Sequence, residues 1–133
     1  MNTIATLLRA LQLYAHNAHN LAKGPNFFSD HEYLGELYEA YEGAYDSIVE
    51  RMIGEGDEDP NLGEIGLKAA TIIKDKTIGS NDQAFSVLLS TEEKLRAEIE
   101  KEVPNASLGT QNLLQQLADD SLSRCYKLKQ RLE

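Results

Sequence analysis

The sequence contains no tryptophan, one cysteine and three prolines among its 133 residues. The single cysteine, Cys125, excludes an intrachain disulfide and indicates a protein kept in a reducing compartment. Because Cys125 falls at helical spacing among apolar residues, we expect a small core residue there rather than a nucleophile. The prolines stand between the periodic segments, where they do not interrupt a helix.

Basic residues are also scarce. The chain has 13 Lys and Arg against 22 Asp and Glu, which gives a formal net charge of −9. No basic patch is evident beyond Lys127, Lys129 and Arg131. The charge therefore argues against a partner with a dense phosphate backbone, such as DNA.

Long apolar runs are absent too. No stretch of about 18 apolar residues could span a membrane. The first twenty residues are apolar at helical spacing and lack the basic start and small-residue cleavage site of a signal peptide. We therefore expect a mature, cytoplasmic protein, and the length and composition predict one globular domain over residues 1–133.

The sequence does contain four long segments with apolar residues at helical spacing. Lys23, Gly24 and Pro25 end the first helix, and Asn26 or Ser29 can cap the second, where Ser29 and Glu32 fit a capping box. The predicted helices cover residues 3–22, about 29–52, about 80–103 and about 107–132, with a short amphipathic segment at about 65–73. The predicted buried positions are Ile4, Leu7, Leu8, Leu11, Ala15, Ala18, Leu21, Phe85, Leu88, Leu89, Leu95, Ile99, Leu113, Leu114, Leu117, Cys125, Leu128 and Leu132. The fold class is therefore all-α: a ferritin-like four-helix bundle with a short helix in the connection between helices two and three.

The second predicted helix carries an acidic stripe beside its apolar face. At about 100° per residue, one arc of the helix holds a histidine, a glycine and four carboxylates. These residues are His31, Gly35, Glu39, Glu42, Asp46 and Glu50. Asp46 and Glu50 are four residues apart and can bind one cation together, although such pairs also occur on ordinary solvated faces. Apolar neighbours that crowd the two carboxylates would raise the free energy of keeping both charged, unless a cation compensated them.

His19 and His31 are the candidate nitrogen ligands, whereas His16 is interpreted as a solvated or structural residue. His31 precedes Asp46 by 15 residues, which is roughly 22 Å along a helix, too far for one metal ion. Either other helices of the same bundle complete the site, or a second copy of this helix runs antiparallel beside the first. The Glu-x-x-His pairs of an intra-bundle di-iron centre are absent. An antiparallel homodimer would bring His31 near the partner's carboxylates twice, by two-fold symmetry.

These residues resemble the second-helix region of the Dps family, the ferritin-like proteins of DNA protection during starvation. The resemblance extends more weakly over the whole chain, including GTQNLLQQL at residues 109–117. The matching positions, in register and without an insertion, are His19, Gly24, Asn26, Phe27, His31, Asp46, Glu50 and Arg51.

The resemblance implies a ferroxidase site across a subunit interface. His19 and His31 would come from one chain, and Asp46 and Glu50 from its partner. Members of this family assemble from dimers into hollow twelve-subunit shells, oxidise Fe(II), preferably with hydrogen peroxide, and store the ferric mineral inside. Removing both reactants protects against hydroxyl radicals, so the resemblance implies an iron-dependent oxidoreductase of oxidative stress.

The sequence departs from the family pattern at three places. Gly35 replaces a ligand aspartate, and Glu39 or Glu42 on the same stripe are substitute carboxylates. Asn20 replaces a tryptophan. Because helical periodicity starts at about residue 3, we expect no basic N-terminal extension of the kind found in DNA-binding members. An alternative hypothesis is therefore a shell-forming structural or interaction protein that has lost ferroxidase activity. The same ligands also suit Zn²⁺ or Mn²⁺.

An acidic loop at residues 57–61 suggests calcium at first sight. An EF-hand needs Gly and Glu where this chain has Leu62 and Lys68. We therefore expect a solvated loop.

Overall fold

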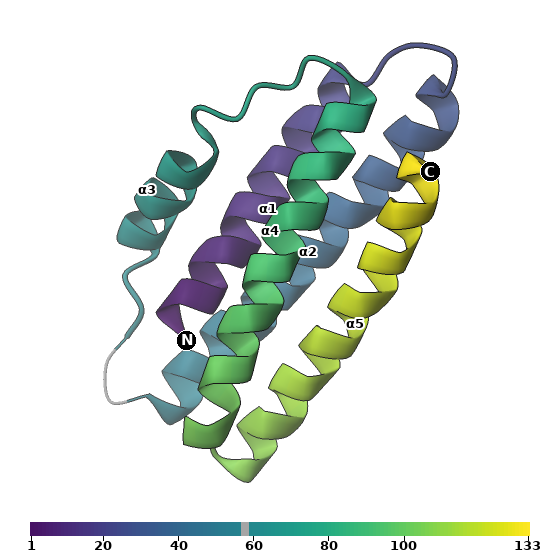
Figure 1. The fold of residues 1–133 in the computed structure, drawn as a ribbon. Coiled ribbons are helices and arrows are strands. Elements are labelled where there is room, and N and C mark those ends of the chain that lie inside the picture. The colour runs from purple at the N-terminus through teal and green to yellow at the C-terminus, as the bar shows by residue number, and fades with distance from the viewer. Residues whose placement is uncertain (57–58) are drawn as a thin grey trace.

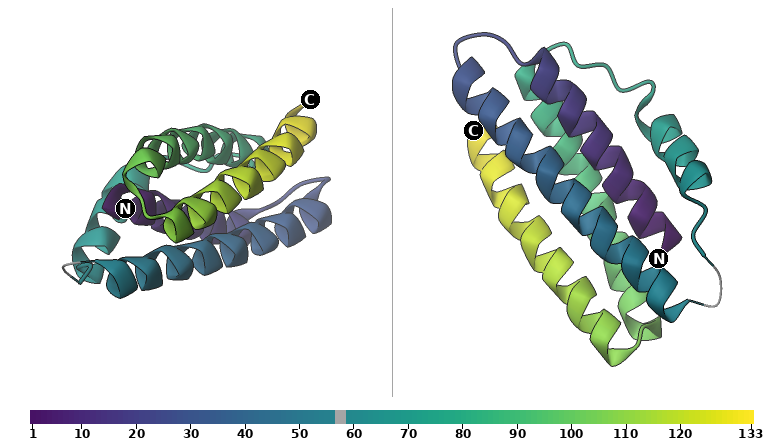
Figure 2. Two further views of the ribbon diagram at one scale, coloured as in Figure 1. Left: turned by 90° about the horizontal axis from the view of Figure 1, so that it is seen from below. Right: turned by 180° about the vertical axis from the view of Figure 1, so that it is seen from behind.

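The computed structural model describes residues 1–56 and 59–133. Two antiparallel helix pairs pack together into a bundle (Figure 1). Its long helices are α1 (Asn2–Leu21), α2 (Phe27–Glu55), α4 (Asn81–Glu102) and α5 (Leu108–Leu132). The view from behind in Figure 2 shows α1 and α2 side by side.

The connection between the two pairs runs the length of the bundle. It contains α3 (Leu62–Ile73), which packs against α1, and a short turn, η1 (Val103–Asn105), joins α4 to α5. The predicted ferritin-like bundle with a short helix between its second and third long helices is therefore confirmed. In the part of the chain that the structure describes, no helix has the length and hydrophobicity needed to cross a membrane.

Three helices begin with the side-chain cap that their sequences favour. The Ser80 hydroxyl accepts from the Gln83 amide, Ser107 accepts from Thr110, and Asn61 accepts from Glu64. At α2 the structure has Asn26, one of the two predicted caps, at the N-cap position, without a side-chain hydrogen bond.

The predicted capping box of Ser29 and Glu32 is wrong. Helix α2 begins at Phe27, so Ser29 lies inside its first turn and donates to the Asn26 carbonyl at 3.2 Å. The helix also continues beyond Met52 to Glu55. Of the predicted acidic loop, residues 57 and 58 lie outside the described residues.

Among the described residues, the core consists of the inward faces of all five α-helices, and most predicted buried positions are confirmed. Cys125 is 2% exposed, as expected of a core residue. Leu21 differs, because α1 ends there and leaves the side chain 50% exposed. Three predicted core residues are only partly buried where their helix faces turn outward: Leu89, Leu113 and Leu132.

A buried carboxylate ties three helix ends together. Asp30 accepts two hydrogen bonds from Arg131, at 2.9 and 2.8 Å, and one from the Asn81 amide at 2.9 Å. Arg131 also pairs with exposed Asp82 at 3.0 Å. Burial alone would raise the pKa of Asp30, but the hydrogen bonds from Arg131 and Asn81 outweigh it and hold the pKa below its ordinary value. This clamp fixes the start of α2, next to His31, against α4 and α5.

Candidate metal site

The turn between α1 and α2 brings two predicted ligands together. Gly24 has a φ of 91°, a left-handed conformation that glycine adopts without strain. The turn places the last part of α1 beside the first turn of α2. As a result the His19 and His31 rings stack, with centroids 3.7 Å apart and planes 17° apart.

Two reciprocal hydrogen bonds fix these rings. His19 Nδ1 donates to the His31 carbonyl at 2.6 Å, and His31 Nδ1 donates to the His19 carbonyl at 2.8 Å. A carbonyl only accepts, so both Nδ1 atoms carry the proton. In the neutral ring this leaves a lone pair on each Nε2, the arrangement found in metal-binding histidines whose other nitrogen donates to a carbonyl.

Aromatic side chains surround the pair. Phe27 stacks on His31 with centroids 4.9 Å apart, and Tyr38 meets His19 edge-on at 5.4 Å. His16 is exposed, as predicted for a solvated residue, and stacks on Tyr38 at 4.1 Å. These contacts restrict the orientation of both imidazole rings from two sides.

The four carboxylates of the stripe are not brought to the histidines within one chain. Glu39, Glu42, Asp46 and Glu50 are all exposed on α2. The expected apolar crowding of Asp46 and Glu50 is therefore wrong, because their apolar neighbours turn inward. Across residues 1–56 and 59–133, no group of three or more His, Cys, Asp or Glu side chains could hold a metal ion.

Gly35 lies directly beside His19. A Cβ added there would be 3.2 Å from His19 Cε1 and 3.3 Å from its Nδ1. The space that a side chain at position 35 would need is therefore partly occupied by the imidazole.

The bundle interior holds an ion pair that the sequence analysis missed. Glu92 is fully buried and accepts two hydrogen bonds from Arg124, at 2.7 and 3.0 Å. The guanidinium lies 4.9 Å from the Tyr41 ring centroid. Burial opposes the charge on Arg124, but its bonds to Glu92 prevail and raise the pKa of the guanidinium above its ordinary value. With both of its oxygens bonded to Arg124, Glu92 is not available as a metal ligand.

The sequence does contain a signal for the pairing of Glu92 with Arg124. Glu92 occupies a core position of α4, in the three-and-four spacing formed by Phe85, Leu88, Leu95 and Ile99. A charged residue on such a face requires an internal partner.

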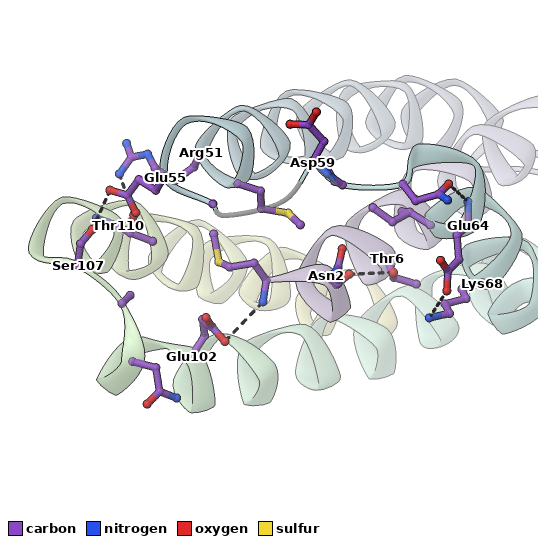
Figure 3. Close-up of a pocket in the computed structure, with 18 residues that line it drawn as sticks. Asn2, Thr6, Arg51, Glu55, Asp59, Glu64, Lys68, Glu102, Ser107 and Thr110 are labelled. Carbon is purple, nitrogen blue, oxygen red and sulfur yellow. Dashed lines mark hydrogen bonds and ion pairs between the residues drawn. The ribbon is translucent and has the colours of Figure 1, made fainter.

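A cavity of about 450 Å³ lies at the opposite end of α1 and α2 (Figure 3). There Glu55 accepts hydrogen bonds from Ser107 at 2.8 Å and Thr110 at 2.6 Å. The bonds from Thr110 and Ser107 lower the pKa of Glu55. Further ion pairs join Met1 to Glu102 and Lys68 to Glu64, as Figure 3 shows. Two carboxylates of this cavity, Glu64 and Glu102, are thus paired with cations of the same chain.

Comparisons with known proteins agree with this architecture. A family model described as "Ferritin-like domain" matches residues 1–133. A mutant of Mycobacterium smegmatis Dps1 has a similar structure, with a TM-score of 0.82 and 19% sequence identity over 99% of this chain and 91% of that chain. No curated protein matches the sequence.

Proposed function

The chain belongs to the ferritin-like family, and from that premise we propose that it is a Dps-type ferroxidase that detoxifies and stores iron. Fe(II) binds at sites that a second copy of the chain completes, is oxidised there, and is stored as ferric mineral in a hollow shell. The shell is a homo-oligomer, expected to be a cytoplasmic dodecamer built from dimers. The observation that carries this proposal is the stacked His19–His31 pair, with both Nε2 lone pairs directed away from their internal hydrogen bonds.

Chain geometry supports a site shared between two copies. His31 and Asp46 lie on one unbroken helix, α2, roughly 22 Å apart along its axis. A second α2 running antiparallel would place the partner's carboxylates opposite the imidazoles. Exposure of Asp46 and Glu50 in the single chain leaves them available for this role.

The proposed ligands suit the oxidation of Fe(II) by hydrogen peroxide. Two imidazole nitrogens and two carboxylates leave coordination positions open for an oxidant. Two Fe(II) ions each give one electron to one hydrogen peroxide molecule, which takes up two protons and becomes two water molecules. No hydroxyl radical is released, because both electrons reach the same peroxide.

Complementation between two inactive variants tests the shared site. One chain carries His19→Ala and His31→Ala, and the other carries Asp46→Ala and Glu50→Ala. Each homo-oligomer should lose saturable Fe(II) binding in anaerobic titration. Chains refolded together in equal amounts should regain about a quarter of the wild-type sites, since half of the dimers are mixed and each mixed dimer has one intact site.

Three results would each contradict a part of the proposed function. No regained binding in verified mixed oligomers would contradict a site shared between chains. Absence of saturable Fe(II) binding in the wild-type protein would refute the ferroxidase itself, and a stable monomer would contradict the assembly.

A second candidate is a shell-forming protein of the same fold without ferroxidase activity. It is favoured by Gly35, which contributes no ligand beside His19. This alternative predicts an intact oligomer without peroxide-dependent Fe(II) oxidation. For either candidate, the net charge of −9 predicts no retardation of DNA in a gel shift at low salt.

A further inference from the structure

Gly35 and Gly43 are both glycines within α2, but their surroundings differ. Around Gly43, nothing lies within 4 Å of an added Cβ. At Gly35 the added atom would meet the His19 ring at 3.2 Å, closer than ordinary van der Waals contact. Of these two positions, it is therefore Gly35 where the absence of a side chain matters structurally.

The His19 ring has little freedom to move away from such an atom. Its Nδ1, one of the two atoms that would be contacted, donates to the His31 carbonyl at 2.6 Å. Its face lies against the His31 ring, and Tyr38 meets it edge-on. Any displacement must stretch the hydrogen bond or tilt the stack.

We propose that Gly35 sets the metal preference of this site, by leaving room for the stacked His19 ring and by adding no oxygen ligand of its own. The inference rests on the proposed function, because it concerns the same site. One chain then contributes only imidazole nitrogens, from His19 and His31. Such a set favours ions that accept nitrogen ligands readily, such as Zn²⁺, over ions that prefer carboxylate oxygen, such as Mn²⁺.

Two substitutions at position 35 separate the effect of the space left for the His19 ring from the effect of the missing oxygen ligand. Gly35→Ala adds the Cβ without a ligand, whereas Gly35→Asp adds the same atom and a carboxylate. Gly43→Ala is the matched control, since it makes the same change on the same helix without touching a ring. All three are prepared as the assembled, metal-free protein.

Calorimetric titration with Zn²⁺ and with Mn²⁺ provides the readout, and it needs no turnover. Gly35→Ala should weaken Zn²⁺ binding about tenfold, as changes to the groups that orient a ligand do, without strengthening Mn²⁺ binding. Gly35→Asp should reduce the ratio of Zn²⁺ to Mn²⁺ affinity by at least about tenfold, because it adds an oxygen ligand. Gly43→Ala should bind both ions as the wild type does.

The histidine ring signals in NMR spectra of the metal-free protein give a second measurement. Gly35→Ala should shift the His19 and His31 ring protons, since the stack is disturbed, and Gly43→Ala should not. Unchanged Zn²⁺ affinity in Gly35→Ala, or an unchanged affinity ratio in Gly35→Asp, would overturn the role of Gly35 and leave the proposed function standing. A wild-type protein that binds neither these ions nor Fe(II) would refute both.

Discussion

Two polar regions of this molecule differ in how their groups are partnered. In the bundle interior, both Glu92 oxygens bond to Arg124, and the pair is closed within one chain. At the turn between α1 and α2, His19 and His31 use Nδ1 internally and leave Nε2 without a hydrogen bond among the described residues. The interior pair is satisfied within the chain, whereas the Nε2 atom of each imidazole is left unused by the described residues.

This difference explains why the two regions should respond oppositely to mutation. A buried charge that loses its partner is costly, because water cannot replace that partner. A half-exposed imidazole can be removed at little cost to folding, since solvent already reaches it. Stability and ligand binding are therefore expected to separate between the two regions.

The largest effect should follow from opening the interior pair. Arg124→Met leaves Glu92 buried without its hydrogen-bonded cation, and the free energy of unfolding should fall by about 3–5 kcal/mol. Urea denaturation followed by circular dichroism measures it. Lys127→Met, an exposed change on the same helix, is the control. Adding Glu92→Leu should recover most of the loss, and a double variant as unstable as Arg124→Met would show that the pair is not the cause.

The imidazole pair should influence stability only when metal is present. With Zn²⁺ at a hundredfold excess over its dissociation constant, the free energy of unfolding of the wild type should rise by about 2.7 kcal/mol. His31→Ala should abolish this increase while changing the metal-free value by less than about 1 kcal/mol. Thermal unfolding with and without metal tests both statements. A large loss in the metal-free variant would mean that His31 is chiefly structural.

The hydrogen bonds and ion pair of Asp30 should make the free energy of unfolding depend on pH. Because the pKa of Asp30 is lowered in the folded protein, its stabilisation is complete above the ordinary value of 3.8 and is lost as the pH falls through the folded value. Asp30→Asn should cost about 2 kcal/mol at neutral pH and flatten the loss of stability below pH 3.8. Asp82→Asn changes a 70% exposed partner of the same arginine and should have a much smaller effect. Equal losses of stability in Asp30→Asn and Asp82→Asn would show that burial of the carboxylate does not determine how much its bonds to Arg131 stabilise the fold.

The smallest effect compares Gly35 and Gly43 of α2. Gly43→Ala should stabilise the helix by roughly 0.5–1 kcal/mol, because alanine loses less backbone entropy on folding. Gly35→Ala should gain less than this, since its Cβ presses on the His19 ring. Precise denaturation of the two variants gives the difference. Equal gains in stability would show that the His19 ring moves away from the added Cβ without a cost in free energy.

Much of the fold was predictable from periodicity. The spacing of apolar residues located the four long helices, and the capping residues Ser80 and Ser107 marked two of their starts. For the start of α2 the sequence left Asn26 and Ser29 as alternative caps; Asn26 holds the position, and the capping box at Ser29 was predicted wrongly. Local signals located the helices, but they did not choose between neighbouring caps.

The candidate site was predictable only in part. The sequence indicated His19 and His31 as ligands and showed that one straight helix separates His31 from Asp46. It did not predict the stacking of the two rings, their reciprocal bonds to carbonyl groups, or the contact of Gly35 with His19. The role of Glu92 as the partner of Arg124 was missed, although its place among apolar core residues was visible.

The sequence alone thus determined the helical pattern, the acidic charge and the types of candidate ligand, because these depend on neighbouring residues and on composition. Only the tertiary structure decided which polar groups are matched within the chain and which are not. The reason is physical: the orientation of a side chain depends on contacts between helices, such as those that join α1 to α2 at the histidines and α4 to α5 at Glu92 and Arg124.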